Sequence, residues 1–192
     1  MAETRIVSTS AGPVEIVQVP GERPPVLFFP GGHCSAKCDC GWGLYTGSGH
    51  AVVSFSRPGY GGTRVGPLSA AEFEPLISEV CEQLDITVIA AAVGVARALF
   101  RCMRSDSGFI NDLRQGQDRW AAARRDVLSK VQCPTLVTGS PHDRGVSFAH
   151  AEDFANAIPD AQLVGLDSPS HIFWIGPGRA RLVSIVRSFI DE

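Results

Sequence analysis

The chain has 192 residues, which suits one domain, and its formal net charge is −3 at neutral pH. Hydrophobic residues make up 44% and charged residues 19%, enough for a core and too little charge for a disordered chain. The acidic balance argues against generic nucleic-acid binding. No apolar run approaches the roughly 20 residues of a membrane helix, and the first residues show no basic stretch followed by an apolar one, so we expect no export signal. We therefore expect one cytoplasmic domain over residues 1–192, with no nucleic-acid or membrane partner.

Short apolar runs separated by turn residues predict strands in the first part of the chain. Arg5–Ser8 and Val14–Val19 flank Ser-Ala-Gly-Pro and predict a hairpin at a sheet edge. Pro25–Pro30 and Ala51–Ser56 predict strands that are buried on both faces. A helix is predicted over residues 34–48 between these two strands, although three glycines weaken its pattern.

A capping box predicts the next helix. Ser69-Ala-Ala-Glu72 precedes an amphipathic run that ends near Leu84. Ile86–Ala91 predicts the following strand, and residues 93–104 predict another helix.

The stretch from Arg97 to Gln132 contains no recognisable strand pattern. Asp118 is placed to cap a helix that runs to about Val131. Beyond it, the chain alternates predicted strands and helices, namely a strand at Thr135–Thr138, a helix over residues 147–158, a strand at Gln162–Leu166 and a helix at Gly178–Asp191. Such alternation indicates an α/β protein, with a mostly parallel sheet and helices on both faces.

Six cysteines are expected to be reduced thiols in a cytoplasmic protein. Cys34, Cys38 and Cys40 lie within seven residues, beside His33, and allow two interpretations. One is a metal site, and the other is a set of small residues that opens a helix after a strand. The C-x3-C-x-C spacing has no matching distal C-x2-C or H-x3-H. We therefore favour the second interpretation and predict neither metal nor cofactor.

The other three cysteines sit in apolar patterns and are predicted to be small core residues. They are Cys81, Cys102 and Cys133.

Three landmarks follow predicted strands in order. They are Pro30-Gly31-Gly32-His33, then Ser56-Arg57-Pro58-Gly59-Tyr60-Gly61, and finally an Asp and a His in Gly139-Ser140-Pro141-His142-Asp143 and Ser168-Pro169-Ser170-His171. The chain resembles the α/β-hydrolase family over nearly its whole length. The most specific part of the resemblance is an Asp past one strand and a His past the next, 28 residues later.

The resemblance implies the roles of these residues. Asp143 matches the acid of a catalytic triad and His171 the base, which takes the nucleophile's proton and returns it to the leaving group. The backbone N–H of Gly32 matches one donor of the oxyanion hole, because glycine lets the backbone approach a substrate. The N–H of Val93 matches the second donor.

The nucleophile that the family requires is absent. Its small-x-Ser-x-Gly elbow corresponds to Ala90-Ala91-Ala92-Val93-Gly94, which places Ala92 at the nucleophile position. A second register, Gly94-Val95-Ala96-Arg97-Ala98, places Ala96 there instead. Neither alanine can attack a carbonyl carbon.

Three explanations of the alanine remain open. The serine was replaced to trap a substrate, the protein is a natural non-catalytic relative, or the chain carries an internal deletion. The third also accounts for the sixth strand and the lid, which are not evident between Arg97 and Gln132.

We expect a protein whose ancestral reaction is hydrolysis of an ester, lactone or similar acyl bond in an apolar small molecule. One alternative is a ligand-binding or scaffold relative without turnover. Another is a lyase or proton-transfer enzyme that uses His171 without a covalent step.

Overall fold

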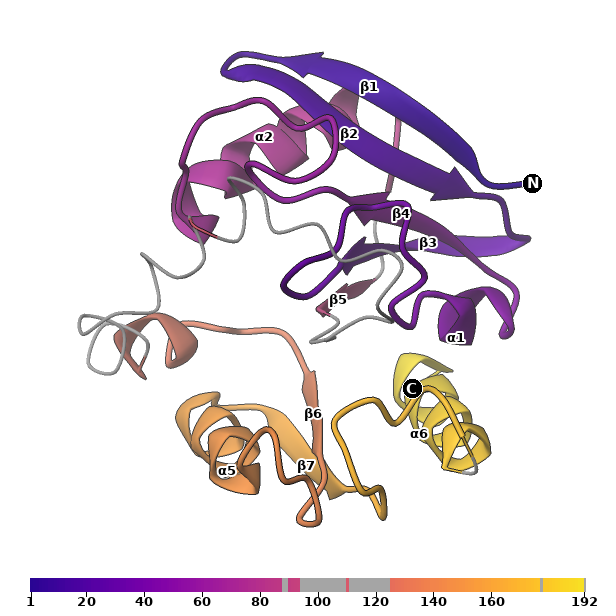
Figure 1. The fold of residues 1–192 in the computed structure, drawn as a ribbon, viewed down its shortest axis with the longest axis vertical. Helices are drawn as coiled ribbons and strands as arrows, with labels where there is room; N and C mark the ends of the chain where they lie inside the picture. Colours follow the sequence, from indigo (N-terminus) through magenta and orange to yellow (C-terminus); the bar gives the residue numbers. More distant parts are fainter. Residues whose placement is uncertain (88–89, 94–109, 111–124, 177, 192) are drawn as a thin grey trace. The chain divides into compact units, whose positions relative to one another are not determined.

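The computed structural model describes residues 1–87, 90–93, 110, 125–176 and 178–191 (Figure 1). The chain divides into two compact units, Met1–Gln115 and Gly116–Glu192. Within the described residues, no helix is both long and apolar enough to cross a membrane.

A five-stranded mixed sheet forms the centre of the first unit. Its strands are β1 (Glu3–Thr9), β2 (Gly12–Val19), β3 (Arg23–Phe29), β4 (His50–Phe55) and β5 (Ala90–Val93), in the order β1-β2-β4-β3-β5. β1 and β2 form the predicted antiparallel hairpin at one edge, and β2 is also antiparallel to β4. β3 runs parallel to both β4 and β5. The hairpin and the strands predicted around Pro25–Pro30 and Ala51–Ser56 are therefore confirmed.

Helix α2 (Ala70–Gln83) packs on this sheet and closes the hydrophobic core of the first unit (Figure 1). The core draws on side chains from the first four strands and on three from α2, namely Phe73, Leu76 and Val80. Their spacing places them on one helical face. Burying one large apolar side chain completely stabilises the folded state by about 1.5–3 kcal/mol relative to leaving it exposed. The predicted capping box is present, because Ser69 Oγ accepts from Glu72 N and the Glu72 carboxylate accepts from Ser69 N.

The strand predicted over Ile86–Ala91 begins later than expected. The N–H of Ile86 donates to Cys81 O at 2.8 Å, so Ile86 still closes the end of α2. Asp85 has a φ of 50°, which turns the chain away from the helix axis. β5 therefore spans Ala90–Val93.

The helix predicted over residues 34–48 is also wrong. Only α1 (Gly43–Thr46) is helical there. Gly41 has a φ of 117°, and Asp39 Oδ1 accepts from both Gly41 N and Gly43 N at 3.0 Å. Because these side-chain contacts replace the helical hydrogen-bond ladder, the preceding cysteine segment forms a compact loop.

The second unit contains β6 (Thr135–Gly139), α5 (Phe148–Ala157), β7 (Ala161–Gly165) and α6 (Arg179–Asp191). β6 and β7 are parallel, with Gly139 opposite Gly165. The described strands thus form two separate sheets, and three of their five pairings are parallel. The α/β fold class and the strand–helix alternation are as predicted from the sequence.

Two other predictions fall largely on residues outside the described ranges. The helix over 93–104 lies there almost entirely, as does most of the stretch in which the sixth strand and the lid are not evident. Residues 125–128 are helical and belong to the end of the helix predicted from Asp118.

The described cysteines form no disulfide with one another. Cys81 is half-buried and packs against the core, but Cys133 is exposed, so its assignment as a core residue is wrong. Cys133 precedes β6, and its place before the strand leaves it outside the packed face. Cys102 lies outside the described residues.

Candidate active site

Parallel pairing of β6 and β7 brings two loops together at the carboxyl edge of the second unit's sheet. Leu166 N donates to Gly139 O at 2.8 Å, one residue beyond the end of β7. The loop after β6 carries Asp143, and the loop after β7 carries His171. The carboxyl ends of parallel strands are where open α/β sheets bind ligands, so this edge is the candidate site.

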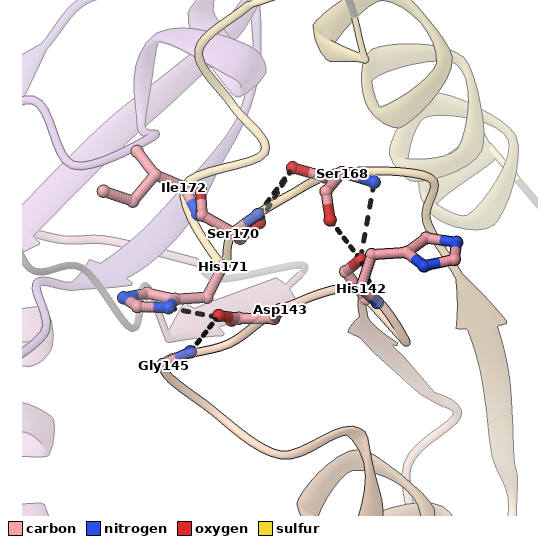
Figure 2. Close-up of polar contacts among 8 residues, drawn as sticks. His142, Asp143, Gly145, Ser168, Ser170, His171 and Ile172 are labelled. Carbon is pink, nitrogen blue, oxygen red and sulfur yellow. Dashed lines mark hydrogen bonds and ion pairs between the residues drawn. The ribbon is translucent and has the colours of Figure 1, made fainter.

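Asp143 and His171 form a direct pair (Figure 2). His171 Nδ1 lies 2.8 Å from Asp143 Oδ2, and their side chains are 16% and 3% exposed. An ionised carboxylate can only accept a hydrogen bond, so Nδ1–H is the donor to it. The neutral ring then carries its lone pair on Nε2, the atom that a general base uses. The two side chains that the sequence singles out therefore contact each other within the second unit.

The other oxygen of Asp143 is held by the backbone of its own loop. Gly145 N donates to Oδ1 at 2.7 Å. Burial by itself raises the pKa of Asp143, but hydrogen bonds from the backbone of Gly145 and Val146 and from His171 outweigh burial and lower it. The carboxylate is therefore ionised and able to orient the imidazole.

Two serines connect the loops that carry the pair. Ser140 Oγ donates to Ser168 O at 2.5 Å, and it accepts from Ser168 N and His142 N at 3.4 and 3.2 Å. Ser168 Oγ in turn donates to Ser170 O at 2.8 Å, next to His171. Ser140 is buried, so these bonds are shielded from water and hold the separation of the loops.

A glycine at position 145 leaves room for the pair. A Cβ there would lie 3.3 Å from His171 Cε1 and 3.4 Å from Asp143 Oδ1. The neighbouring His142 has a different environment, because its Nε2 lies 3.7 Å from the exposed Asp167 and its ring points away from the pair (Figure 2).

The remaining predicted site residues belong to the first unit. Gly32 lies in the turn after β3, and a Cβ at this position would meet no atom within 4 Å. Next to it, His33 has a φ of 68° and its N–H donates to Tyr60 Oη at 3.3 Å. Ala92 and Val93 belong to β5 and pair with Phe28 and Phe29 of β3. Ala96 lies outside the described residues.

A polar cluster around the buried Glu15 carboxylate in the first unit was not predicted from the sequence. Glu15 Oε2 lies 2.8 Å from Lys37 Nζ, and Glu15 Oε1 accepts from Ser56 Oγ at 2.8 Å. Ser56 Oγ also accepts from Ala36 N at 2.7 Å. The cluster ties β2 and the end of β4 to the loop after β3. Its only sequence signal is a lone Glu within the apolar run of β2.

The sequence is similar to that of a curated protein over part of its length. This relative is the Bacillus subtilis (strain 168) protein named "Uncharacterized hydrolase YcgS", 34% identical over 89 residues. The match covers 46% of this chain and 30% of that protein, so the chain spans less than a third of the relative's length. No family model matches the chain.

Solved structures resemble nearly the whole chain. An esterase from Exiguobacterium antarcticum has a TM-score of 0.70 at 14% identity, covering 99% of this chain and 100% of its own. The esterase RhEst1 from Rhodococcus sp. has a TM-score of 0.69 at 16% identity, covering 98% of each chain.

An α/β hydrolase fold protein from Nakamurella multipartita has a TM-score of 0.67 at 17% identity and covers 98% of this chain and 99% of its own. At these identities the likeness concerns the fold. Together with the strand order and the paired loops described above, it shows that this chain has the α/β-hydrolase fold.

Proposed function

We propose that this chain descends from a hydrolase of esters, lactones or similar acyl bonds, and that an alanine now occupies its nucleophile position. The observation that supports this best is the Asp143–His171 pair at the carboxyl edge of β6 and β7. Its substrate class would be a small, apolar acyl compound in the cytoplasm.

In the ancestral reaction His171 Nε2 would take the proton of a serine hydroxyl as that oxygen attacks the acyl carbon. Asp143 would stabilise the imidazolium that forms. The N–H groups of Gly32 and of the residue after the nucleophile would donate hydrogen bonds to the developing oxyanion. His171 would then return its proton to the leaving alcohol. The chain as written has no hydroxyl at either alanine, so no acyl-enzyme can form.

The extent of β5 bears on which alanine replaced the serine. Ala92 and Val93 pair with β3, so the strand continues past position 92. An elbow nucleophile lies in the turn after its strand. Ala96 lies outside the described residues, so both registers stay open, with Val93 or Arg97 as the residue whose N–H would be the second oxyanion donor.

The experiment restores the hydroxyl. Ala92→Ser and Ala96→Ser are made separately and assayed with p-nitrophenyl acetate and butyrate, while a fluorophosphonate probe reports the activated serine. We expect one of the two serine variants to hydrolyse the esters and to react with the probe, and the further change His171→Ala to abolish both. If both serine variants fold, as judged by circular dichroism, yet neither exceeds the chain as written, the proposal is wrong.

A second candidate is proton transfer or elimination without a covalent step. It is favoured by the intact acid–base pair, which needs no nucleophile to move a proton. Under this second candidate, the unaltered chain has an activity, and His171→Ala abolishes that activity. A ligand-binding relative without turnover would instead keep its affinity for an acyl compound in His171→Ala.

A further inference from the structure

Three thiols converge in the loop between β3 and α1. Cys34, Cys38 and Cys40 are 0%, 7% and 2% exposed, and their Sγ atoms all lie within 4.8 Å of one another. The loop belongs to the first unit and is built from a different part of the chain than the Asp143–His171 pair. This convergence follows from the loop that replaces the predicted helix. On a helix, the C-x3-C-x-C spacing would place Cys40 on a different face from the other two.

The separation of the sulfur atoms suits a single thiophilic ion. Metal–sulfur bonds of about 2.3 Å place three thiolates around one ion about 4 Å apart. A contraction of less than about 1 Å therefore brings the three sulfurs to bonding distance of a central ion. A disulfide would instead need two sulfurs about 2.05 Å apart and would leave the third thiol unused.

Contacts outside the cysteines hold the loop in this shape. Lys37 Nζ lies 2.8 Å from the Glu15 carboxylate, and Ala36 N donates to Ser56 Oγ. Within the loop, Cys38 N donates to Ser35 O and Cys40 N donates to Cys38 O. The thiols are therefore positioned before any ion binds, which reduces the entropy that binding must overcome.

The three thiols are buried, and three buried negative charges without a cation would be costly. An ion that binds as the S–H protons leave would offset that cost.

We propose that Cys34, Cys38 and Cys40 bind one thiophilic d10 metal ion, Cu⁺ or Zn²⁺, through three thiolates. Three S–H protons are released as three metal–sulfur bonds form, and no oxidant or reductant is needed. Thiolates select these soft ions over Mg²⁺ and Ca²⁺. The described residues bring no fourth side-chain ligand to the group, so Zn²⁺ would complete its shell with water, whereas Cu⁺ needs none. A bound ion would crosslink three residues of the loop that follows β3 and so stabilise its conformation.

The test uses the full chain, purified without oxygen in the presence of a non-thiol reductant. Cu⁺ and Zn²⁺ are added in separate arms, unbound ion is removed, and the metal content per chain is measured. We expect one equivalent of Cu⁺ or Zn²⁺ to be retained and the midpoint of thermal unfolding to rise with it. Cys38→Ser should weaken retention at least about tenfold, and Cys133→Ser, which removes an exposed thiol, should not change it.

A second measurement avoids dependence on a variant that fails to fold. Co²⁺ added to the unaltered chain should produce thiolate-to-metal charge-transfer absorption in the near ultraviolet. The proposal is overturned if neither Cu⁺ nor Zn²⁺ is retained, if Zn²⁺ is retained but Co²⁺ gives no such absorption, or if folded Cys38→Ser binds as well as the unaltered chain. It is also overturned if mass spectrometry under reductant finds a disulfide within the three cysteines.

Discussion

Ser140 Oγ donates a hydrogen bond to Ser168 O across the two loops that carry the acid and the base. The bond joins residues 28 positions apart in the sequence and fixes how far Asp143 lies from His171. The geometry of the candidate site therefore depends on a residue that has no catalytic role of its own.

Ser140→Ala should destabilise the chain. The substitution leaves Ser168 O without its buried donor, which costs about 1–3 kcal/mol of unfolding free energy. Urea unfolding followed by circular dichroism measures the loss, with exposed Ser129→Ala as a control expected to change stability by less than about 0.5 kcal/mol. Equal effects of the two substitutions would contradict a structural role for the Ser140–Ser168 bond.

Gly145→Ala should displace the His171 ring, because the new Cβ would crowd both members of the pair. The ring signals of His171 in NMR spectra should shift, while the overall fold is retained. The matched control is Gly32→Ala, whose Cβ would enter open space and should leave those signals unchanged. Unaltered His171 signals in Gly145→Ala would show that the pair tolerates the methyl group.

Asp143 should contribute stability that disappears in acid. Its pKa is lowered in the folded chain, so the folded state favours the ionised form. The contribution is fully present above the ordinary carboxyl pKa and is lost as the pH falls through that value towards the lower folded one. Unfolding free energies of the unaltered chain and of Asp143→Asn should therefore converge as the pH decreases from 7 to 3. If the difference in unfolding free energy between the two chains did not change with pH, this linkage would be refuted.

Lys37→Met should destabilise the first unit by leaving the Glu15 carboxylate buried without its cation. Glu15 is 3% exposed but Lys37 is 56% exposed, so solvent screening reduces the effect to about 1–2 kcal/mol. In a double-mutant cycle, Lys37→Met should cost less when Glu15→Gln is already present. Additive losses would mean that the two side chains are not coupled.

Ser69→Ala should cost about 1 kcal/mol of unfolding free energy, because it removes the side-chain acceptor of the α2 capping box. Thermal and urea unfolding provide the measurement. Ser78 lies on the exposed surface of the same helix, and Ser78→Ala should be neutral or slightly stabilising. Comparable losses in the two variants would show that the cap contributes nothing.

The sequence predicted correctly those elements that depend on interactions between residues close together in the chain. The strands of the hairpin, the capping box of α2 and the strand–helix alternation around Asp143 and His171 depend on hydrophobic period and on residues a few positions apart. The helix over residues 34–48 failed because the Asp39 side chain and a positive φ at Gly41 override a weak helical pattern. The start predicted for β5 was too early, because the N–H of Ile86 still bonds to the end of the preceding helix.

The sequence by itself determined the α/β class, the places of Asp143 and His171 after successive strands, and the absence of a serine at both candidate elbows. Only the tertiary structure decided that Asp143 bonds His171, that Ser140 bridges their loops, and that Glu15 is buried against Lys37. It also decided that three cysteines on an expected helix meet in one loop. The spacing of these residues along the chain does not say which of them meet in space. Their contacts follow from strand pairing and packing rather than from any local pattern.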